Sequence, residues 1–310
     1  MFVLKVVVSI ASLYVVSRSI AWAAVGNVLM QAQYSLMFIA LIIFWVAQVF
    51  SALRCVYVAR VLGGALDLST SLRAHLVGLW FNQVMPTSLG GDVIKIAILK
   101  KSLGWNMAIR SAILDRLSGF VFLLLATAIA LPLFTNLFPS HRELVIALGV
   151  IAVGGGLTIV LGAWAAHRIS KLPTLKPAFL KLIQLFCDVW AFRKGTPLWE
   201  QAWTSAIVHF NGIVTYALLG VALGINVDFI TFLLVVPVIF LIALIPVSYA
   251  GWGLREAGAV WLFGMVGIAN ESALAMSVCF GLLLVLAGLP GLLLFLHQSL
   301  TQPTGKQNAS

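Results

Sequence analysis

Long apolar runs separated by short polar connections dominate this sequence. A membrane-spanning helix needs about 20 predominantly apolar residues. Runs of about this length predict spans at 3–22, 35–59, 112–132, 143–167, 199–223, 229–247 and 271–297. Shorter apolar pieces, which suit re-entrant or interfacial helices, occur at 71–85, 93–99 and 257–268. The pattern therefore predicts an all-α polytopic membrane protein with about seven to eight transmembrane helices and two broken or re-entrant segments.

The composition excludes a water-soluble fold. Hydrophobic residues make up 62% of the chain and charged residues 9%, with a mean hydropathy of +1.09, whereas about a quarter of a soluble domain is charged. The net charge of +10 does not indicate a nucleic-acid partner, because the Lys and Arg residues lie in short connections between apolar runs. We expect one transmembrane domain, 1–300, followed by a disordered polar tail, 301–310.

The distribution of basic residues predicts the orientation in the membrane. The connection 168–198 has six basic residues and one acidic residue, which places it in the cytoplasm. The basic stretch 95–110 is predicted to lie on the same side, and Lys5 predicts that the N-terminus lies there too. The side of the C-terminus stays open. Residues 6–23 also imitate a signal peptide, but Arg18 before the small-residue site favours an uncleaved first span.

Nothing in the sequence indicates a catalytic or metal centre. The cysteines, Cys55, Cys187 and Cys279, lie far apart without metal-ligand spacing and are typical of apolar packing residues. The glycine runs have no Lys-Ser/Thr of a phosphate-binding loop, and no nucleophile motif is present. We therefore predict no catalytic residue, no metal and no cofactor.

The segment 82–95 places charge where a membrane protein normally avoids it. Ionisable groups at membrane depth usually face a cavity, a partner or a substrate, and non-helical backbone there is tolerated only inside protein or beside water. A proline break is followed by a glycine pair and by opposite charges one helical turn apart. These positions are Asn82, Pro86, Gly90, Gly91, Asp92 and Lys95. The alternative is that Asp92 is only an acid at a helix start on the cytoplasmic surface.

The segment 246–256 repeats this arrangement in the second half of the chain. Its break and charges are Pro246, Ser248, Gly251, Gly253, Arg255 and Glu256. Adjacent residues on a helix do not face each other, so we expect Arg255 and Glu256 to need separate partners. The same reasoning applies to the neighbouring pair Asp115 and Arg116. A broken segment in each half of a membrane protein is typical of a transport site.

Charges without local partners predict that these segments meet in one polar centre. We expect Asp92 or Asp115 to pair with Arg255, and Glu256 to pair with Lys95 or Arg116. The candidate substrate-binding residues are then Asn82, Pro86, Gly90, Gly91, Asp92, Lys95, Asp115, Arg116, Ser248, Gly251, Gly253, Arg255 and Glu256. The alternative is a structural ion network that holds helices together. We expect Arg54 and Arg60 to reach toward the cytoplasmic headgroups.

The chain resembles the lysylphosphatidylglycerol synthase transmembrane family, also called flippase-like membrane proteins. The resemblance rests on Asn82…Pro86…Gly90-Gly91-Asp92-Val93-Ile94-Lys95, on Leu114-Asp115-Arg116-Leu117, and on Pro246…Gly251-Trp252-Gly253-Leu254-Arg255-Glu256-Ala257. The family usually has Arg where this chain has Lys95, and often Glu where it has Asp115. Both differences keep the charge, but Lys lacks the bidentate phosphate grip of Arg.

The resemblance implies translocation of an anionic phospholipid or polyprenyl-linked lipid between leaflets of a bacterial or archaeal cytoplasmic membrane. Lys95, Arg116 and Arg255 would hold phosphate, and Asp92 and Glu256 would balance the empty site. Because the chain stops about a dozen residues after its last predicted span, we expect the translocating unit without an aminoacyl-transferase domain, and no enzyme activity. The implied partners are membrane lipids and a lipid or glycan biosynthesis enzyme, with no nucleic acid.

Two other functions remain open. The chain could be an accessory that scaffolds or regulates a lipid or glycan enzyme without transporting anything. It could also be a membrane-embedded transferase acting on a polyprenyl phosphate, for which Asp92 and Asp115 are the plausible acidic pair. The sequence indicates neither the lipid nor the oligomeric state.

Overall fold

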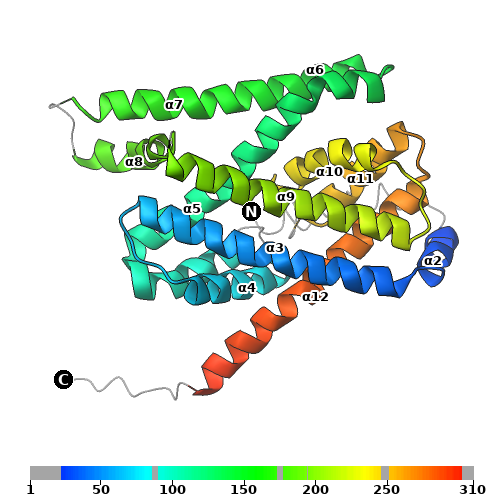
Figure 1. Ribbon diagram of the computed structural model, residues 1–310, viewed down its shortest axis with the longest axis horizontal. Helices are drawn as coiled ribbons and strands as arrows, with labels where there is room; N and C mark the ends of the chain where they lie inside the picture. Colours follow the sequence, from blue (N-terminus) through cyan, green and yellow to red (C-terminus); the bar gives the residue numbers. More distant parts are fainter. Residues whose placement is uncertain (1–21, 86–89, 173–176, 194, 246–250, 302–310) are drawn as a thin grey trace.

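The structure is a computed structural model that describes residues 22–85, 90–172, 177–193, 195–245 and 251–301. These residues form helices and no strands (Figure 1). The helices are α2 (Trp22–Met30), α3 (Tyr34–Val61), α4 (Leu68–Val84), α5 (Gly90–Leu137), α6 (Arg142–Gly149), the π-helix η1 (Val150–Gly154), α7 (Gly155–Ile169), α8 (Pro177–Ala191), α9 (Thr196–Ala222), α10 (Phe229–Ala243), α11 (Leu254–Met265) and α12 (Asn270–Thr301).

Five stretches of the described chain are long and apolar enough to cross a membrane. They are α3, α5, the continuous stretch α6–η1–α7, α9 and most of α12. They contain the predicted spans 35–59, 112–132, 143–167, 199–223 and 271–297, except for Leu223 at the end of α9. The chain is therefore an all-α, multi-pass membrane protein, as the hydrophobic pattern predicts. The predicted span 3–22 lies almost entirely outside the described residues, as does most of the tail 301–310.

The predicted span 229–247 was wrong in its length. The helix α10 has 15 residues, or about 22 Å at 1.5 Å per residue, which is short of the roughly 30 Å hydrocarbon core. Pro237 lies inside this helix. The helix ends at Ala243 and is followed by Leu244 and Ile245, before the predicted break at Pro246 and Ser248, which lies outside the described residues.

Two pairs of short helical segments form hairpins. In the first hairpin, α4 packs against the first part of α5, residues 90–103, and in the second, α10 packs against α11. We call them the first and second hairpins. Figure 1 shows the first hairpin in the left half of the molecule and the second in the right half, so they come in from opposite ends. Paired helices too short to cross are the arrangement expected of re-entrant segments.

A sharp turn at Gly104 folds α5 back on itself. Gly104 has φ 72° and ψ 165°, a conformation that glycine adopts without steric cost. In a straight helix Asp92 and Arg116 would be about 36 Å apart, yet their side chains form an ion pair. The first part of α5, 90–103, therefore runs back from the break, and the second part crosses the molecule.

Ion pairs link connections rich in basic residues to neighbouring helices at one end of the molecule. Arg110 on α5 donates to Asp188 on α8, with Nε 2.6 Å from Oδ2, and Arg60 at the end of α3 donates to Glu200 on α9. This end holds Arg110 of the stretch 95–110 and Asp188 of the connection 168–198, two stretches predicted to be cytoplasmic from their charge. The last turns of α12 run toward the same end (Figure 1). Which side of the membrane this end faces stays a prediction.

Close backbone contacts hold the first hairpin between its neighbours. The helix α4 packs along α12, where a Cβ at Gly291 would lie 2.0 Å from the carbonyl oxygen of Leu76. At the start of α4, Asp67 caps the helix by accepting a hydrogen bond from the Thr70 amide at 2.8 Å. A hydrogen bond from the Ser69 hydroxyl, together with the bond from the Thr70 amide, lowers the pKa of Asp67 to about 2. The contact with α12 thus fixes the hairpin along one side, and the cap stabilises the start of α4.

Candidate functional site

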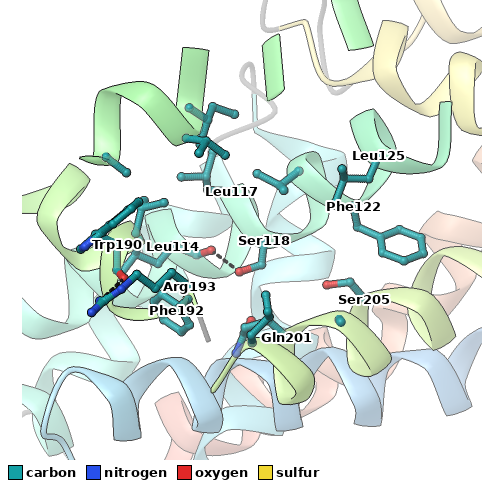
Figure 2. A pocket seen from close by; sticks show the side chains of 17 residues that line it. Leu114, Leu117, Ser118, Phe122, Leu125, Trp190, Phe192, Arg193, Gln201 and Ser205 are labelled. Carbon is teal, nitrogen blue, oxygen red and sulfur yellow. Dashed lines mark hydrogen bonds between the residues drawn. The ribbon is translucent and has the colours of Figure 1, made fainter. Parts of the chain in front are cut away.

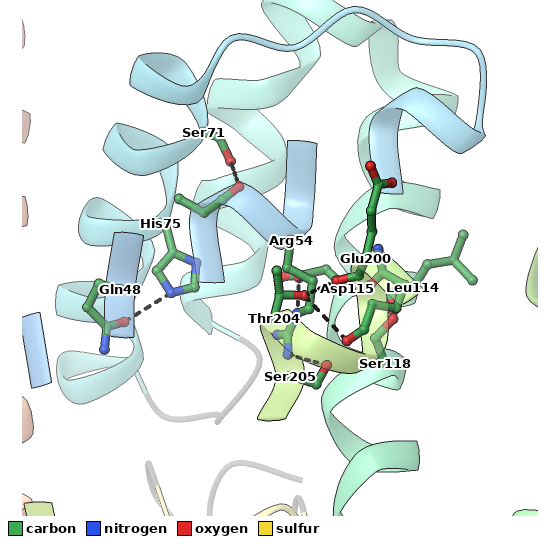
Figure 3. Close-up of polar contacts among 12 residues, drawn as sticks. Gln48, Arg54, Ser71, His75, Leu114, Asp115, Ser118, Glu200, Thr204 and Ser205 are labelled. Atoms are coloured by element: carbon green, nitrogen blue, oxygen red, sulfur yellow. Dashed lines mark hydrogen bonds and ion pairs between the residues drawn. The ribbon is translucent and has the colours of Figure 1, made fainter. Parts of the chain in front are cut away.

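A buried ion triplet joins α3 to both parts of α5. The Asp115 carboxylate accepts from Arg54 Nε at 2.8 Å through one oxygen and from Lys95 Nζ at 2.7 Å through the other. All three residues are buried. Arg54 also donates to the Ser205 hydroxyl on α9 at 3.2 Å (Figure 3). Three helices therefore depend on one carboxylate, and removing it would leave two buried cations without their counter-charge.

A second ion pair, Arg116 with Asp92, lies on the wall of a pocket. Their side chains are 30% and 26% exposed, far more than those of the triplet, and both line a pocket of about 640 Å³. The other described lining residues are all apolar: Val93, Ile96, Ala112, Ile113, Leu117, Phe120, Leu241, Leu244 and Ile245. We call this the α5–α10 pocket. It combines one ion pair with a long apolar surface.

The third ion pair is internal to the second hairpin. The guanidinium of Arg255 donates to Glu256 Oε1, with Nε at 3.0 Å and one terminal nitrogen at 2.5 Å. The other oxygen of Glu256 accepts from the Gly253 amide at 2.6 Å and so caps the start of α11. The Arg255 guanidinium also lies over the ring of Trp252, 4.8 Å from its centroid. Both charged side chains are buried and satisfied within the hairpin.

The expected pairings between the two hairpins were wrong. Arg255 pairs with its own neighbour instead of Asp92 or Asp115, and Glu256 pairs with neither Lys95 nor Arg116. The rule that adjacent helix residues do not face each other fails here for a specific reason. Glu256 folds back to the helix start to cap it, which brings its carboxylate within reach of the long Arg255 side chain.

The neighbouring charges Asp115 and Arg116 do have separate partners, as the sequence predicts. Asp115 faces Arg54 and Lys95, whereas Arg116 faces Asp92. Because successive side chains point in directions about 100° apart around a helix, one residue turns into the core and the next toward the α5–α10 pocket. This part of α5 therefore connects the buried triplet to the pocket wall.

The glycine pair of the first motif permits close approach of the hairpin's two helices. The Gly91 amide donates to the Asn82 side-chain oxygen at 2.9 Å, and a Cβ at Gly91 would lie 1.9 Å from the carbonyl oxygen of Gly78. A Cβ at Gly90 would collide with the side chain of Met85. Asn82, Gly90 and Gly91 thus build the break, while Pro86 lies outside the described residues.

The glycines of the second motif have a different role. Gly251 and Gly253 adopt φ angles of 82° and 88°, which other residues reach only with strain. They turn the chain into α11, so that Glu256 can reach back to the amide of Gly253. Ser248 of this motif lies outside the described residues.

Arg54 belongs to the polar network, and the sequence did not predict this role. It was expected to reach the headgroups, but it is buried and bound to Asp115, whereas Arg60 is exposed as expected. A signal was present in the helical spacing of small and polar residues on one face of α3, all of them buried: Ala47, Ser51, Arg54 and Val58. Such a stripe indicates a packed helix face, so an arginine within it needs a buried partner.

Two histidines beside the network have packing roles. His75 Nε2 lies 3.1 Å from the Gln48 side-chain oxygen on α3 (Figure 3). The His209 ring stacks on Phe122 with centroids 5.5 Å apart. Among the described residues, no group of three or more His, Cys, Asp and Glu side chains is placed to hold a metal ion.

Comparison with known proteins identifies the family. No curated protein and no solved structure matches the chain. The family described as "Lysylphosphatidylglycerol synthase TM region" matches residues 2–291, which is nearly the whole sequence and includes both hairpins with their charged residues. The chain therefore belongs to the family of the lysylphosphatidylglycerol synthase transmembrane region.

Proposed function

We propose that this protein binds an anionic lipid in the α5–α10 pocket and moves it between the leaflets of a cytoplasmic membrane. The observation that carries this proposal is an ion pair on the wall of a pocket whose other described lining residues are apolar. A lipid with a phosphate headgroup presents the same combination of an anion and long apolar chains. The family membership supports the proposal, because members of this family are often flippase-like.

Arg116 is the residue proposed to bind the phosphate. It is partly exposed, lines the pocket and is paired with the carboxylate of Asp92. A lipid phosphate can replace that carboxylate as the partner of the guanidinium, because Arg binds both groups in the same bidentate geometry. Asp92 then acts as the counter-charge of the empty site, and displacing it exchanges one ion pair for another.

Lys95, Asp115, Arg255 and Glu256 have a structural role in this proposal. Their side chains are buried and bind protein partners, so a headgroup would have to break these interactions to reach them. Lys95 and Arg255 were expected to contact phosphate, and the contacts now favour assigning that task to Arg116. The break residues Asn82, Gly90 and Gly91 shape the backbone beside the pocket.

The two hairpins suggest how the lipid crosses. They come in from opposite ends, and both contribute to the α5–α10 pocket, through 92–96 of the first and 241–245 of the second. A headgroup held between them lies at a depth where the bilayer offers no polar partner. The pocket shelters the headgroup, and the acyl chains remain against apolar walls and lipid.

The contacts of the acidic residues argue against the transferase alternative. Acid–base or metal chemistry on a polyprenyl phosphate would need Asp92 and Asp115 to act together. Asp92 pairs with Arg116, and Asp115 pairs with Arg54 and Lys95. The two carboxylates thus share no cation, and their partners lie on different sides of α5.

Proteoliposomes test the proposal. Phosphatidylglycerol and phosphatidylcholine carrying a fluorophore on one chain report leaflet exchange through quenching by dithionite outside the vesicle. We expect faster exchange of the anionic lipid, and a loss of at least about tenfold for Arg116→Gln, since a charged hydrogen-bonded contact contributes about 1.5–3 kcal/mol. The thermal stability of the variant should stay near that of the wild type, because the pair is partly exposed.

Arg60→Gln is the matched control, because Arg60 is also paired with an acidic residue but is exposed at one end of the molecule. It should exchange lipid at the wild-type rate. Equal exchange of both lipids by the wild type, or full activity of Arg116→Gln, would contradict the proposal. Exchange no faster than in protein-free vesicles would favour the accessory function.

A further inference from the structure

A second pocket lies on the other side of α5, between α7, α8 and α9. Its volume is about 230 Å³, and we call it the α8 pocket. Figure 2 shows Leu114, Trp190 and Phe192 together on one side of it, and Phe122 and Leu125 on the other. Leu117 lines this pocket and also the α5–α10 pocket, so the two pockets share this residue of α5.

No described residue forms a hydrogen bond with the side chain of Gln201 on α9, which lines this pocket. Gln201 is 7% exposed, and both its amide nitrogen and its amide oxygen are buried without a partner. Leaving a buried polar group unpaired costs about 1–3 kcal/mol, and most such groups in native proteins are paired. A bound group that both donates and accepts hydrogen bonds would satisfy the amide, and a hydroxyl does both.

The charge of the pocket favours an anion. Arg193 is the only charged residue among its described lining residues, and it is exposed at the end of α8. Its guanidinium lies 5.1 Å from the ring centroid of Trp190 and donates to the Trp190 carbonyl oxygen at 3.0 Å. An Arg beside a Trp at a helix end is typical of the headgroup region of a bilayer.

The size and walls of the pocket favour a single chain. Pockets that enclose a drug-sized ligand measure about 300–1,000 Å³, so a pocket of about 230 Å³ is too small for two acyl chains and leaves room for one at most. Leu125, Val160 and Leu198 line the pocket and are about half exposed. On a membrane protein such residues face lipid, so a chain can enter sideways from the bilayer.

We propose that the α8 pocket binds an anionic lysophospholipid, with its phosphate at Arg193, its free hydroxyl at Gln201 and its single chain along α5 and α7. A lysophospholipid combines one chain, an anionic group and a hydroxyl next to both. The site is separate from the α5–α10 pocket and does not depend on the transport activity proposed there. Ser205 connects it to the buried triplet, because this residue lines the pocket and accepts from Arg54.

Photocrosslinking tests this assignment. The full chain in phosphatidylcholine nanodiscs is irradiated with lysophosphatidic acid that carries a diazirine at the end of its chain, and the labelled peptides are identified by mass spectrometry. We expect labels within 121–125 of α5 and 159–163 of α7. Gln201→Leu should reduce this labelling about tenfold, because two hydrogen bonds are lost, without reducing thermal stability, because an unpaired buried amide is removed.

Competition on the wild-type protein keeps the test independent of the folding of any variant. Unlabelled lysophosphatidic acid should compete about tenfold better than its analogue without the hydroxyl, than monoacylglycerol, which lacks the anion, and than two-chain phosphatidic acid. Equal competition by the analogue without the hydroxyl, or better competition by phosphatidic acid, would overturn the proposal. Labels absent from 121–125 and 159–163 would overturn it as well.

Two variants separate this site from the transport site. Arg116→Gln should leave labelling within 121–125 and 159–163 unchanged, even where it abolishes lipid exchange. Gln31→Leu replaces an exposed glutamine between α2 and α3 and should also change nothing. If either of these two variants lost α8-pocket labelling as strongly as Gln201→Leu does, the loss in Gln201→Leu would not be specific. Gln201 would then not be a ligand-binding residue of this pocket.

Discussion

The first hairpin binds its charges to partners elsewhere in the chain, whereas the second hairpin binds its charges to each other. Lys95 and Asp92 of the first hairpin pair with residues on the second part of α5. Arg255 and Glu256 of the second pair within α11 and use a backbone amide of the same hairpin. The two sequence motifs are alike, but the charges they carry serve different structures.

The difference shows which charges remain accessible to a ligand. In the second hairpin both side chains are at most 4% exposed and the carboxylate caps a helix, so the pair holds the hairpin together. In the first hairpin Lys95 is equally buried, but Asp92 stands at the pocket with its partner Arg116. The ligand-binding function is therefore assigned to one ion pair on the pocket wall, and the other charges are assigned to stability.

The largest effect is expected from Asp115→Asn. This change leaves the buried cations of Arg54 and Lys95 without their counter-charge, and breaking a buried pair costs about 3–5 kcal/mol. We expect little folded protein in the membrane and a strongly lowered melting temperature of whatever is purified. Immunoblotting and thermal unfolding in detergent measure both.

The double variant Asp115→Asn with Lys95→Met is the control for this prediction, because it removes one of the stranded cations. It should recover part of the stability that Asp115→Asn loses. Wild-type abundance of Asp115→Asn would show that the triplet does not hold α3 and α5 together.

The second largest effect is expected from Arg255→Met. It leaves the Glu256 carboxylate buried with only the Gly253 amide and a 3.4 Å contact from the Ser277 hydroxyl. We expect a loss of about 3 kcal/mol, at the lower end for a broken buried pair. Thermal unfolding of the purified variant measures the loss.

Adding Glu256→Gln to Arg255→Met should restore most of that stability. Gln is uncharged, and its side-chain oxygen still accepts from the Gly253 amide, so the double variant has neither a stranded charge nor an uncapped helix. A double variant less stable than Arg255→Met alone would contradict the view that the pair is purely structural.

These residues also show how far the sequence predicts the structure. The long helices follow from runs of about 20 apolar residues, and the breaks follow from proline and glycine between half-length runs. The separate partners of Asp115 and Arg116 follow from helix geometry alone. All of these depend on spacing along the chain, which a single sequence records directly.

The partners themselves could not be predicted, because they depend on three-dimensional contacts. Nothing in the spacing of 90–137 shows that the turn at Gly104 brings Asp92 to Arg116. The capping bond of Glu256 turns its carboxylate toward Arg255, which a rule about helix faces ignores. Gln201 was missed because it follows Glu200 near the start of a predicted span, where polar residues are expected, and only the pocket reveals that it lacks a partner.

A smaller effect is expected from alanine at the glycines of the two breaks, and it should differ between them. Gly91→Ala places a Cβ 1.9 Å from a backbone oxygen of Gly78, so the helices of the first hairpin must separate, at a cost of about 1–3 kcal/mol. Gly251→Ala meets no atom closer than 3.7 Å and has only the strain of its positive φ, about 1 kcal/mol. Thermal unfolding ranks the two variants.

Asparagine at the same positions sharpens this comparison. Asn tolerates positive φ better than Ala does, so Gly251→Asn should be more stable than Gly251→Ala. At Gly91 the larger side chain should be worse than alanine. The same order at both positions would mean that the two breaks are built in the same way.

The smallest effect on stability is expected from Asp92→Asn. The Asp92–Arg116 pair is 26–30% exposed, and such partly solvated pairs contribute about 1 kcal/mol or less, so abundance and melting temperature should stay close to those of the wild type.

The effect of Asp92→Asn on lipid should be larger: binding of an anionic lipid should become tighter, and its transport should become slower. Without the competing carboxylate, Arg116 should hold a phosphate headgroup more tightly and release it more slowly. We expect more anionic lipid retained on the purified protein, measured by native mass spectrometry, and slower exchange in proteoliposomes. Weaker retention together with slower exchange would mean that Asp92 itself contacts the lipid, and unchanged values of both would remove the α5–α10 pocket from the transport path.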